Sequence, residues 1–341
     1  MIIKPDNEML SYSGRIDFDD RLAPVLVYAC SSIGMKFTGT SLKAVIANHR
    51  SCWTNELGYF IDGEQKRFTL SSDEEKKTYT LAEGLSEGTH ELLLFKRMDS
   101  CHTFTFYGFE IDDGAEVLPL PEKPKRKMEF FGDSVSCGEV SEAVAYVGKP
   151  DPEHDGEYSN SWYSYAWMTA RKLNAQIHDT SQGGISLLDD TGWFAAPHYK
   201  GVESCYDKIE YHPDLGPTKQ WDFSKYVPHV VVVAIGQNDN HPVDYMAEDY
   251  DSEKSKNWRK HYQAFIEKLM QLYPKAQIIL ATTILCMIKA GTDPSTKSAH
   301  ALAVRESIIF STQKMAPARR DTSASRKQSR CRMSLRRIST H

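Results

Sequence analysis

The chain has 341 residues, 40% of them hydrophobic and 26% charged, with a formal net charge of −5 at pH 7. It is long and apolar enough for two domains of roughly 100–200 residues each, which excludes a mainly disordered protein. A membrane-spanning helix is excluded as well, because no apolar run approaches the roughly 18 residues that a span needs.

The charge is distributed unevenly along the chain. Residues 317–341 hold eight Lys or Arg residues and Asp321 as their only acid, so this segment carries +7 and the remainder −12. An acidic body does not indicate a nucleic-acid-binding protein, and a basic segment nearly without apolar residues is typical of a disordered arm. We therefore expect no nucleic-acid partner and no membrane partner, and the oligomeric state is left open.

The cysteines indicate a reducing compartment. There are seven, an odd number, and none forms a C-x-x-C pair, which argues against a disulfide framework and against a zinc site. The first ten residues lack the basic start and the long apolar core of a signal peptide. These features predict a cytoplasmic chain.

Residues 1–118 have the pattern of an all-β domain, a β-sandwich of jelly-roll type. Short runs of strand-forming residues are separated by Gly, Asn, Asp and Ser, and Asp62-Gly63 between two runs is a strong hairpin signal. The predicted strands are 24–28, 34–37, 42–47, 57–61, 67–70, 77–81, 88–97 and 103–111. Its aromatic residues are expected in the core, with a sugar-stacking surface as the alternative: Trp53, Tyr59, Phe60, Phe104, Phe106 and Tyr107.

Residues 119–127 are predicted to be a linker, because the stretch LPLPEKPKRK at 118–127 is rich in proline and basic residues. From 128 to 315 strands alternate with helices, which predicts a doubly wound parallel sheet and an α/β fold class for this half. The predicted strands are 128–131, 175–180, 227–235 and 277–282, and the predicted helices are 161–173 and 256–273. Residues 316–341 are the basic, disordered tail.

Three of the predicted parallel strands end in loops with reactive or glycine residues. The loops are GDSVSCG at 132–138, QGGIS at 182–186 and GQND at 236–239. Loops that follow parallel strands meet at one edge of the sheet, where open α/β sheets bind their ligands. We therefore expect Ser134, a glycine of the second loop and Asn238 to converge there.

This set of groups suits ester hydrolysis. Ser134 would attack the acyl carbon, and the charge that develops on the acyl oxygen would be stabilised by three donors. These are the Ser134 amide, the amide of Gly183 or Gly184, and the side-chain nitrogen of Asn238. Each loop alone has a simpler explanation, because Asp-Ser after a strand often caps a helix and Asn is often a turn residue. The combination favours the esterase hypothesis.

With these blocks the chain resembles the SGNH/GDSL hydrolase superfamily, which has a Gly-Asp-Ser motif, a glycine, a G-x-N-D motif and a late histidine. The preceding β-sandwich makes it most similar to carbohydrate esterase family 2, acetyl esterases that act on acetylated xylan and related glycans. The resemblance extends to about residue 315. It implies an acetylated carbohydrate substrate and no cofactor, with Ser134 as nucleophile, Asn238 and a glycine amide as oxyanion donors, and Asp133 as a brace of the turn.

The chain departs from this family at the histidine. A serine hydroxyl needs a general base near neutral pH, and the family carries that base in a segment like T-P-G-H-I-R-I, which is not visible here. Residues 315–335 can be back-translated with permitted codons and then read one nucleotide out of phase. That reading can give GTGTPGHIRIPEAEQMQNEL, which contains the missing histidine segment. We hypothesise that the reading frame shifts near residues 313–315, removing the base and the last helix. Sequencing the coding DNA tests this.

Further residues are candidates for contact with a substrate. Asp239 and His241 follow Asn238 in the third loop, and Trp162 and Trp193 can stack on a sugar, although either can equally belong to the core. His241 is also a candidate for the missing base. Five further histidines are expected at the surface or in the tail: His178, His198, His212, His300 and His341.

Two functions stay open. The first is an esterase that removes acetyl groups from a polysaccharide or oligosaccharide, impaired if the general base is absent. The second is a glycan-binding protein without turnover that uses the same loops together with Trp162, Trp193 and Trp221. Ester turnover that depends on Ser134 distinguishes them.

Overall fold

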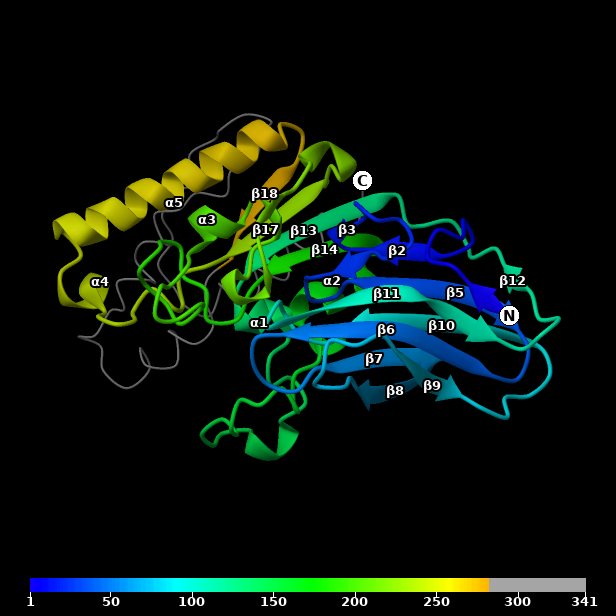
Figure 1. Cartoon of the computed structure of the whole chain (residues 1–341). Coiled ribbons are helices and arrows are strands. Elements are labelled where there is room, and N and C mark those ends of the chain that lie inside the picture. Colours follow the sequence, from blue (N-terminus) through cyan, green and yellow to red (C-terminus); the bar gives the residue numbers. More distant parts are fainter. Residues whose placement is uncertain (282–341) are drawn as a thin grey trace.

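A computed structural model describes residues 1–281. The predicted tail, the region of the hypothesised frame shift, His300, His341 and the last residue of the predicted strand 277–282 lie outside the described residues. A β-rich half lies beside a half in which helices flank a smaller sheet (Figure 1). Within the described range no helix is long and apolar enough to cross a membrane.

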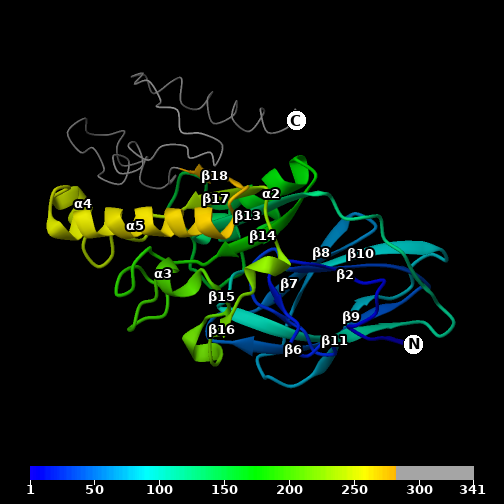
Figure 2. The ribbon, with the colours of Figure 1, turned by 90° about the horizontal axis from the view of Figure 1, so that it is seen from above.

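The N-terminal half consists of two antiparallel sheets of six strands each, which confirms the predicted sandwich (Figure 2). The first sheet has the order β3 (Ile16–Asp17), β4 (Val25–Leu26), β11 (His102–Ile111), β6 (Leu42–Arg50), β9 (Lys77–Ala82), with β1 (Ile2–Ile3) beside β11. The second has the order β12 (Val117–Leu118), β5 (Ser32–Thr38), β10 (Thr89–Lys96), β7 (Glu56–Ile61), β8 (Glu64–Thr69), with β2 (Ser11–Ser13) beside β5.

Alternation of side chains along the strands forms the core between these sheets. Ile33, Met35 and Phe37 of β5 point inward and pack in one cluster with Phe104 and Phe106 of β11. Successive side chains of a strand point to opposite faces, so every second residue reaches the other sheet. The core role expected for the aromatic residues of this domain is therefore confirmed for Tyr59, Phe104 and Phe106.

The predicted hairpin at Asp62-Gly63 is also present. Ile61 pairs with Glu64, and the two residues between them have φ values of 52° and 85°. Positive φ at both positions is the geometry of the tight turn that Asp-Gly favours, which explains why this dipeptide joins β7 to β8.

The second half is built on a four-stranded parallel sheet with the order β14 (Ala175–Ser181), β13 (Arg126–Gly132), β17 (Val230–Ala234), β18 (Gln277–Leu280). Its longest helices are α2 (Tyr165–Lys172) and α5 (Glu253–Leu272). Shorter elements are α1 (Ser134–Cys137), α3 (Val202–Cys205), α4 (Tyr245–Glu248), η1 (Val144–Tyr146), η2 (Ser161–Tyr163), η3 (Pro213–Leu215), η4 (Phe223–Lys225) and a hairpin of β15 (Lys208–Glu210) and β16 (Lys219–Gln220).

Both faces of the parallel sheet are covered, so the predicted doubly wound α/β fold is confirmed. Phe131 and Val231 pack in a cluster with residues of α5, whereas their neighbours Phe130 and Val232 pack in a cluster with residues of α2. A strand buried on both faces reads as a continuous apolar run, which is why β17 was the clearest strand in the sequence. It begins after Pro228, three residues later than predicted.

Serine caps move the starts of both predicted helices. The predicted helix 161–173 is divided at Ser164, whose backbone is extended and whose hydroxyl accepts a hydrogen bond from the Trp167 amide. The predicted helix 256–273 instead begins at Glu253, because the Ser252 hydroxyl accepts from the Ser255 amide. A capping serine satisfies an amide that would otherwise lack a partner, which fixes the first turn at that position.

The sandwich and the parallel sheet share buried contacts. Arg15, which follows β2, enters the second half, where its guanidinium lies 2.9 Å from a Glu129 carboxylate oxygen of β13. It also donates to the carbonyl oxygens of Tyr206 at 2.7 Å and Lys208 at 3.1 Å. Phe95 of β10 belongs to the same apolar cluster as Phe130 and the α2 residues. The connection from β12 to β13 runs over residues 119–125; the boundaries predicted at 118 and 127 stay a prediction.

Candidate active site

Three loops leave the same edge of the parallel sheet. The last residue of β13, Gly132, pairs with Ser181 at the end of β14 and with Ala234 at the end of β17. Because all three strands are parallel, the loops that follow them begin at one level beside one another.

Ser134 is the first residue of α1, and Asp133 holds it there. One Asp133 carboxylate oxygen accepts from the Val135 amide at 3.1 Å, and the other accepts from the Gln237 side chain at 2.6 Å. Burial raises the pKa of Asp133 to about 6. This carboxyl is 1% exposed and ties the first loop to the third, so it braces the turn as the resemblance implied. Within residues 1–281 the Ser134 hydroxyl and amide donate no hydrogen bond.

A glycine before this turn is required by space. A Cβ added at Gly132 would lie 2.0 Å from the Ser136 hydroxyl oxygen, and 3.1 Å from that of Ser181. Neither neighbour can give way freely, because both are buried. The Gly-Asp-Ser order therefore follows from packing at the strand end as well as from chemistry.

Asn238 is partly buried, and its side chain is oriented by the second loop. The side-chain nitrogen donates to the Ile185 carbonyl oxygen at 2.9 Å. An amide nitrogen has two hydrogens, so one remains for a second acceptor. This bond joins the loop after β17 to the loop after β14.

The two glycines of the second loop differ in what their amides do. The Gly183 amide donates to a carboxylate oxygen of Asp99 at 2.7 Å, and the Gln182 side chain donates to the same oxygen at 2.9 Å. The Gly184 amide has no acceptor among the described residues. Gly184 has a φ of 73°, a conformation that favours glycine. The sequence left open which of the two glycine amides donates to the oxyanion. Because the Gly183 amide is already hydrogen-bonded, the structure favours the Gly184 amide.

Asp99 comes from the sandwich, in the connection from β10 to β11, and it is 4% exposed. Its other carboxylate oxygen accepts from the Cys101 amide at 2.9 Å. The Ser100 hydroxyl and the Tyr211 hydroxyl both donate to the Gln182 side-chain oxygen at 2.8 Å. The contact of Asp99 with the glycine loop was not predicted, because nothing in the sequence around Asp99 indicates that its partner is Gly183, 84 residues away.

Lys96 stands beside Asp99 as a second buried charge. Its ammonium group donates to the carbonyl oxygens of Met98, at 2.9 Å, and of Asp99. Burial lowers the pKa of Lys96 to about 8. The Lys96 charge partly offsets that of Asp99, which lowers the energetic cost of burying this carboxylate.

Two of the residues predicted to touch a substrate make other contacts in the structure. Asp239 is 1% exposed, and one of its oxygens accepts from the Leu187 amide at 2.9 Å and from the Trp258 indole at 2.5 Å. Trp162 packs against Phe60 at 4.4 Å between ring centroids, with the Arg171 guanidinium 3.5 Å above its ring. These contacts favour a structural role for Asp239 and Trp162, and substrate contact by either residue stays a prediction.

Trp193 and His241 remain accessible near the loops. Trp193 is 59% exposed and lies beside the glycine loop. Its ring stacks on His241 with ring centroids 3.5 Å apart. A Cβ added at Gly184 would lie 3.0 Å from the Trp193 Cβ, so the indole stands next to that glycine. The His241 Nδ1 lies 2.7 Å from the Gly192 carbonyl oxygen, which leaves Nε2 unoccupied by this contact.

Three other predicted positions differ. His178 and His212 are 6% and 7% exposed, so the expectation that they lie at the surface is wrong. His178 stacks on Tyr226 with ring centroids 3.5 Å apart, and burial holds its pKa well below the usual range. His198 is exposed as expected. Trp221, a candidate of the glycan-binding alternative, is 8% exposed and packs against His178.

Within the described part of the chain, no group of three or more His, Cys, Asp or Glu side chains is arranged to hold a metal ion. The absence of a cofactor stays an expectation.

A buried carboxyl beneath the loops gives a pH-dependent prediction. Asp179 accepts from the Ser181 hydroxyl at 2.6 Å and from the Cys30 thiol at 3.3 Å, and burial raises its pKa from 3.8 to about 7. Between these pH values the folded protein holds a proton that the unfolded chain has lost, so the stability it contributes disappears as the pH rises through 7. Asp179→Asn cannot titrate.

The free energy of unfolding of Asp179→Asn, relative to the unsubstituted protein, should therefore rise from about pH 4 to about pH 7 and level off above it. Urea unfolding at pH 5 and pH 8 measures the difference. An equal difference at both pH values would contradict the raised pKa.

Residues 12–121 match the family model described as carbohydrate esterase 2 N-terminal. The cellulase/esterase CelE of Acetivibrio thermocellus is 31% identical over 274 residues, 80% of this chain and 31% of CelE. An acetylxylan esterase / glucomannan deacetylase of Cellvibrio japonicus is 26% identical over 257 residues, 73% of this chain and 67% of that protein. A family two carbohydrate esterase from Clostridium thermocellum, solved with cellohexaose, is 28% identical with a TM-score of 0.68, covering 83% of this chain and 82% of that one. The chain thus spans about a third of CelE.

Proposed function

Because this chain is a carbohydrate-esterase-2-like member of the SGNH hydrolase superfamily, we propose that it removes O-acetyl groups from xylan-like polysaccharides or oligosaccharides with Ser134 as nucleophile. The observation that carries the proposal is the common level of the three strand ends at Gly132, Ser181 and Ala234. From that level Ser134 and Asn238 extend on loops that are joined by hydrogen bonds.

In the proposed reaction the Ser134 oxygen attacks the acetyl carbon, and the carbonyl electron pair moves onto oxygen. The Ser134 amide, the Gly184 amide and the free hydrogen of the Asn238 side chain would donate to that oxygen. Collapse of the intermediate releases the sugar hydroxyl and leaves an acetyl ester on Ser134, which water then hydrolyses to acetate. The resemblance implies a late histidine as the base that takes the serine proton; its segment is not visible in this sequence, and His241 is the candidate in its place.

Gly184 is proposed as the donor because the Gly183 amide is already bonded to Asp99. Asp99 would then act as a positioning residue that fixes the Gln182–Gly183 peptide, which directly precedes the proposed donor. A small displacement of a donor lowers the rate without weakening the binding of substrate.

Asp99→Ala should therefore lower kcat about tenfold and leave KM nearly unchanged. Asp99→Asn should recover most of kcat, because its side-chain oxygen can still accept from the Gly183 amide. Steady-state kinetics with 4-nitrophenyl acetate measure both constants. Equal values of kcat for the alanine and asparagine variants would argue against this role.

Acetate release tests the proposed function. We expect the full chain to liberate acetate from acetylated xylan or acetylated glucomannan, and the release to require the Ser134 hydroxyl. The Cellvibrio japonicus relative is named for both substrates. Release that is the same with and without Ser134 would reject the proposal.

The alternative is a glycan-binding protein without turnover. The exposed Trp193, stacked on His241, favours it, because an accessible indole face beside the loops can hold a sugar whether or not the ester is cleaved. Binding of an oligosaccharide with no Ser134-dependent release of acetate would select this function.

A further inference from the structure

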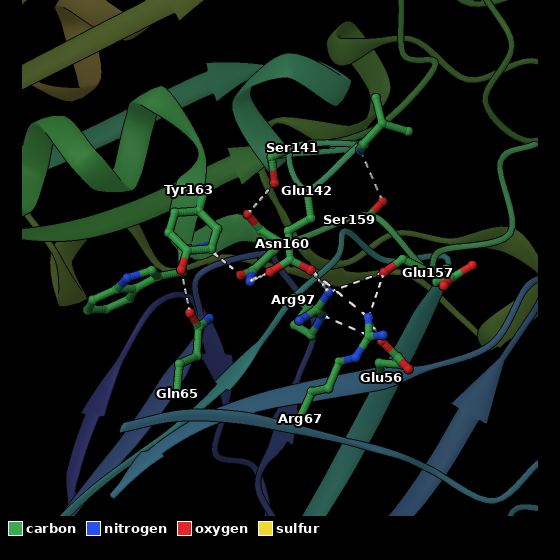
Figure 3. Close-up of polar contacts among 12 residues, drawn as sticks. Glu56, Gln65, Arg67, Arg97, Ser141, Glu142, Glu157, Ser159, Asn160 and Tyr163 are labelled. Atoms are coloured by element: carbon green, nitrogen blue, oxygen red, sulfur yellow. Dashed lines mark hydrogen bonds and ion pairs between the residues drawn. The ribbon is translucent and has the colours of Figure 1, made fainter. Parts of the chain in front are cut away.

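Residues 139–163, the segment between α1 and α2, are fixed to the sandwich by a network of charges (Figure 3). Arg97 of the sandwich is 2% exposed and donates to the Glu142 carboxylate at 2.7 Å and to the Glu157 carbonyl oxygen at 3.3 Å. Arg67 donates to the same Glu157 oxygen at 2.9 Å, and the Asn160 side chain donates to Glu142 at 2.7 Å. Both ends of the segment are thereby held against β8 and β10.

The segment places a carboxylate beside the glycine loop. Glu139 follows α1, and its amide donates to the Ser134 carbonyl oxygen at 3.0 Å. A Cβ added at Gly183 would lie 2.9 Å from one Glu139 carboxylate oxygen. The other oxygen lies 2.5 Å from the His154 Nδ1, and this hydrogen bond raises the pKa of His154. The result is a polar pair directly next to the Gly183 backbone.

Trp53 of the sandwich lies beside the His154 ring of this pair. Its ring centroid is 6.4 Å from that of His154, and the loop that carries it is joined to the segment by the Thr54 amide, which donates to the Asp155 carbonyl oxygen at 3.3 Å. Trp53 has a φ of 56°, which is rare for a bulky residue and costs backbone energy. Unlike Phe104 and Phe106, it does not belong to the buried core of the sandwich.

Side chains that can contact a ligand therefore lie on both sides of the two glycines. On the Gly183 side are Glu139, His154 and Trp53, and on the Gly184 side is the exposed Trp193. The second His154 ring nitrogen lies 3.7 Å from an Asp151 carboxylate oxygen, so it faces that residue and is not hydrogen-bonded to Ser134. This arrangement suits contact with a ligand better than proton transfer to the nucleophile.

We propose that Trp53, Glu139 and His154 form a second carbohydrate subsite, on the opposite side of the glycine loop from Trp193. The carboxylate and imidazole offer an acceptor and a donor to vicinal hydroxyl groups, and the indole offers an apolar face to the sugar ring. A ligand that contacts both sides needs more than one sugar unit, so the protein prefers an oligosaccharide or polysaccharide. The proposal rests on the carbohydrate substrate of the proposed function.

Binding of unacetylated sugars tests the subsite without relying on catalysis. Isothermal titration of the full chain with xylohexaose, mannohexaose and cellohexaose, each compared with its disaccharide, should show a hexaose that binds about tenfold more tightly than its disaccharide. Trp53→Gly should remove that advantage, because glycine adopts a φ of 56° without strain and leaves the backbone unchanged.

The variants separate the indole from the fold. Trp53→Phe retains an aromatic face and should bind within about threefold of the unsubstituted protein, whereas Glu139→Gln should lose about tenfold. Phe18→Ala removes another partly exposed aromatic side chain of the sandwich, 38% exposed, and should change nothing.

Three results would overturn the subsite: hexaose affinity unchanged in Trp53→Gly and Glu139→Gln, affinity independent of chain length, or no binding of any of the three hexaoses. Ser134-dependent release of acetate, measured separately, reports on the proposed function. If Trp193→Ala loses hexaose binding but Trp53→Gly and Glu139→Gln do not, the second subsite is rejected, whereas the proposed esterase function is unaffected.

Discussion

Ser134→Ala is expected to lower kcat/KM for 4-nitrophenyl acetate at least about a thousandfold. The Ser134 hydroxyl is the accessible nucleophile of the three loops, because Ser136, Cys137 and Ser186 are buried. Substituting alanine leaves Asp133, which caps α1 with its own side chain, in place. The variant should therefore fold as the unsubstituted protein does, and circular dichroism with thermal unfolding checks this.

Asn238→Ala is the matched comparison for the serine. Loss of one oxyanion donor typically lowers the rate about a hundred- to a thousandfold, which is less than loss of the nucleophile. Asn240→Ala, in the same loop, serves as control. If Ser134→Ala lowers the rate less than about tenfold, the serine is not activated, as expected of a chain without a general base, and the glycan-binding function is favoured.

Glu129→Gln is expected to lower the free energy of unfolding by about 3–5 kcal/mol. The substitution keeps the shape of the side chain and removes the charge that balances Arg15, with both side chains fully buried. Two nitrogens of Arg15, Nη2 and Nε, donate to the same Glu129 oxygen at 2.9 Å and 3.1 Å. The Thr180 hydroxyl also donates to that oxygen, at 3.1 Å. An unpaired buried guanidinium is what makes the loss large.

Two further variants define the cause of that loss. Lys36→Met breaks an exposed pair with Glu91 of similar length, 3.1 Å, and should change stability by less than about 1 kcal/mol. Removing both buried charges in Arg15→Met with Glu129→Gln should recover much of the loss, because no charge is then left uncompensated. Equilibrium unfolding in urea compares the unsubstituted protein, Glu129→Gln, Lys36→Met and the double variant, and a double variant no more stable than Glu129→Gln would contradict the pairing.

The sequence predicted the sheet edge well because its signals are local. The first and third loops begin directly after apolar runs, whereas the second follows the mixed strand AQIHDTS, and a parallel sheet brings such strand ends to one level whatever the intervening segments do. Helix starts were predicted less well, since Ser164 and Ser252 are ordinary residues until the backbone around them is known.

Other roles depended on contacts that no local pattern encodes. Asp239 and Trp162 belong to segments that suit substrate contact, yet the Asp239 carboxylate bonds to Trp258 of α5 and Trp162 packs against Phe60 of the sandwich. Asp99 has the opposite history: it lies in an unremarked connection of the sandwich and reaches the Gly183 amide. Pairings over such sequence separations follow from the packing of the two halves against each other.

The continuity of that packing bears on how multi-module chains of this type can be rearranged. The sandwich supplies Arg15 to the parallel sheet and Asp99 to the glycine loop, so it cannot be exchanged for another module. If the α/β half were grafted alone onto another scaffold, Glu129 and the Gly183 amide would lose these partners. Any recombination that preserves chemistry would have to transplant both halves as a single unit.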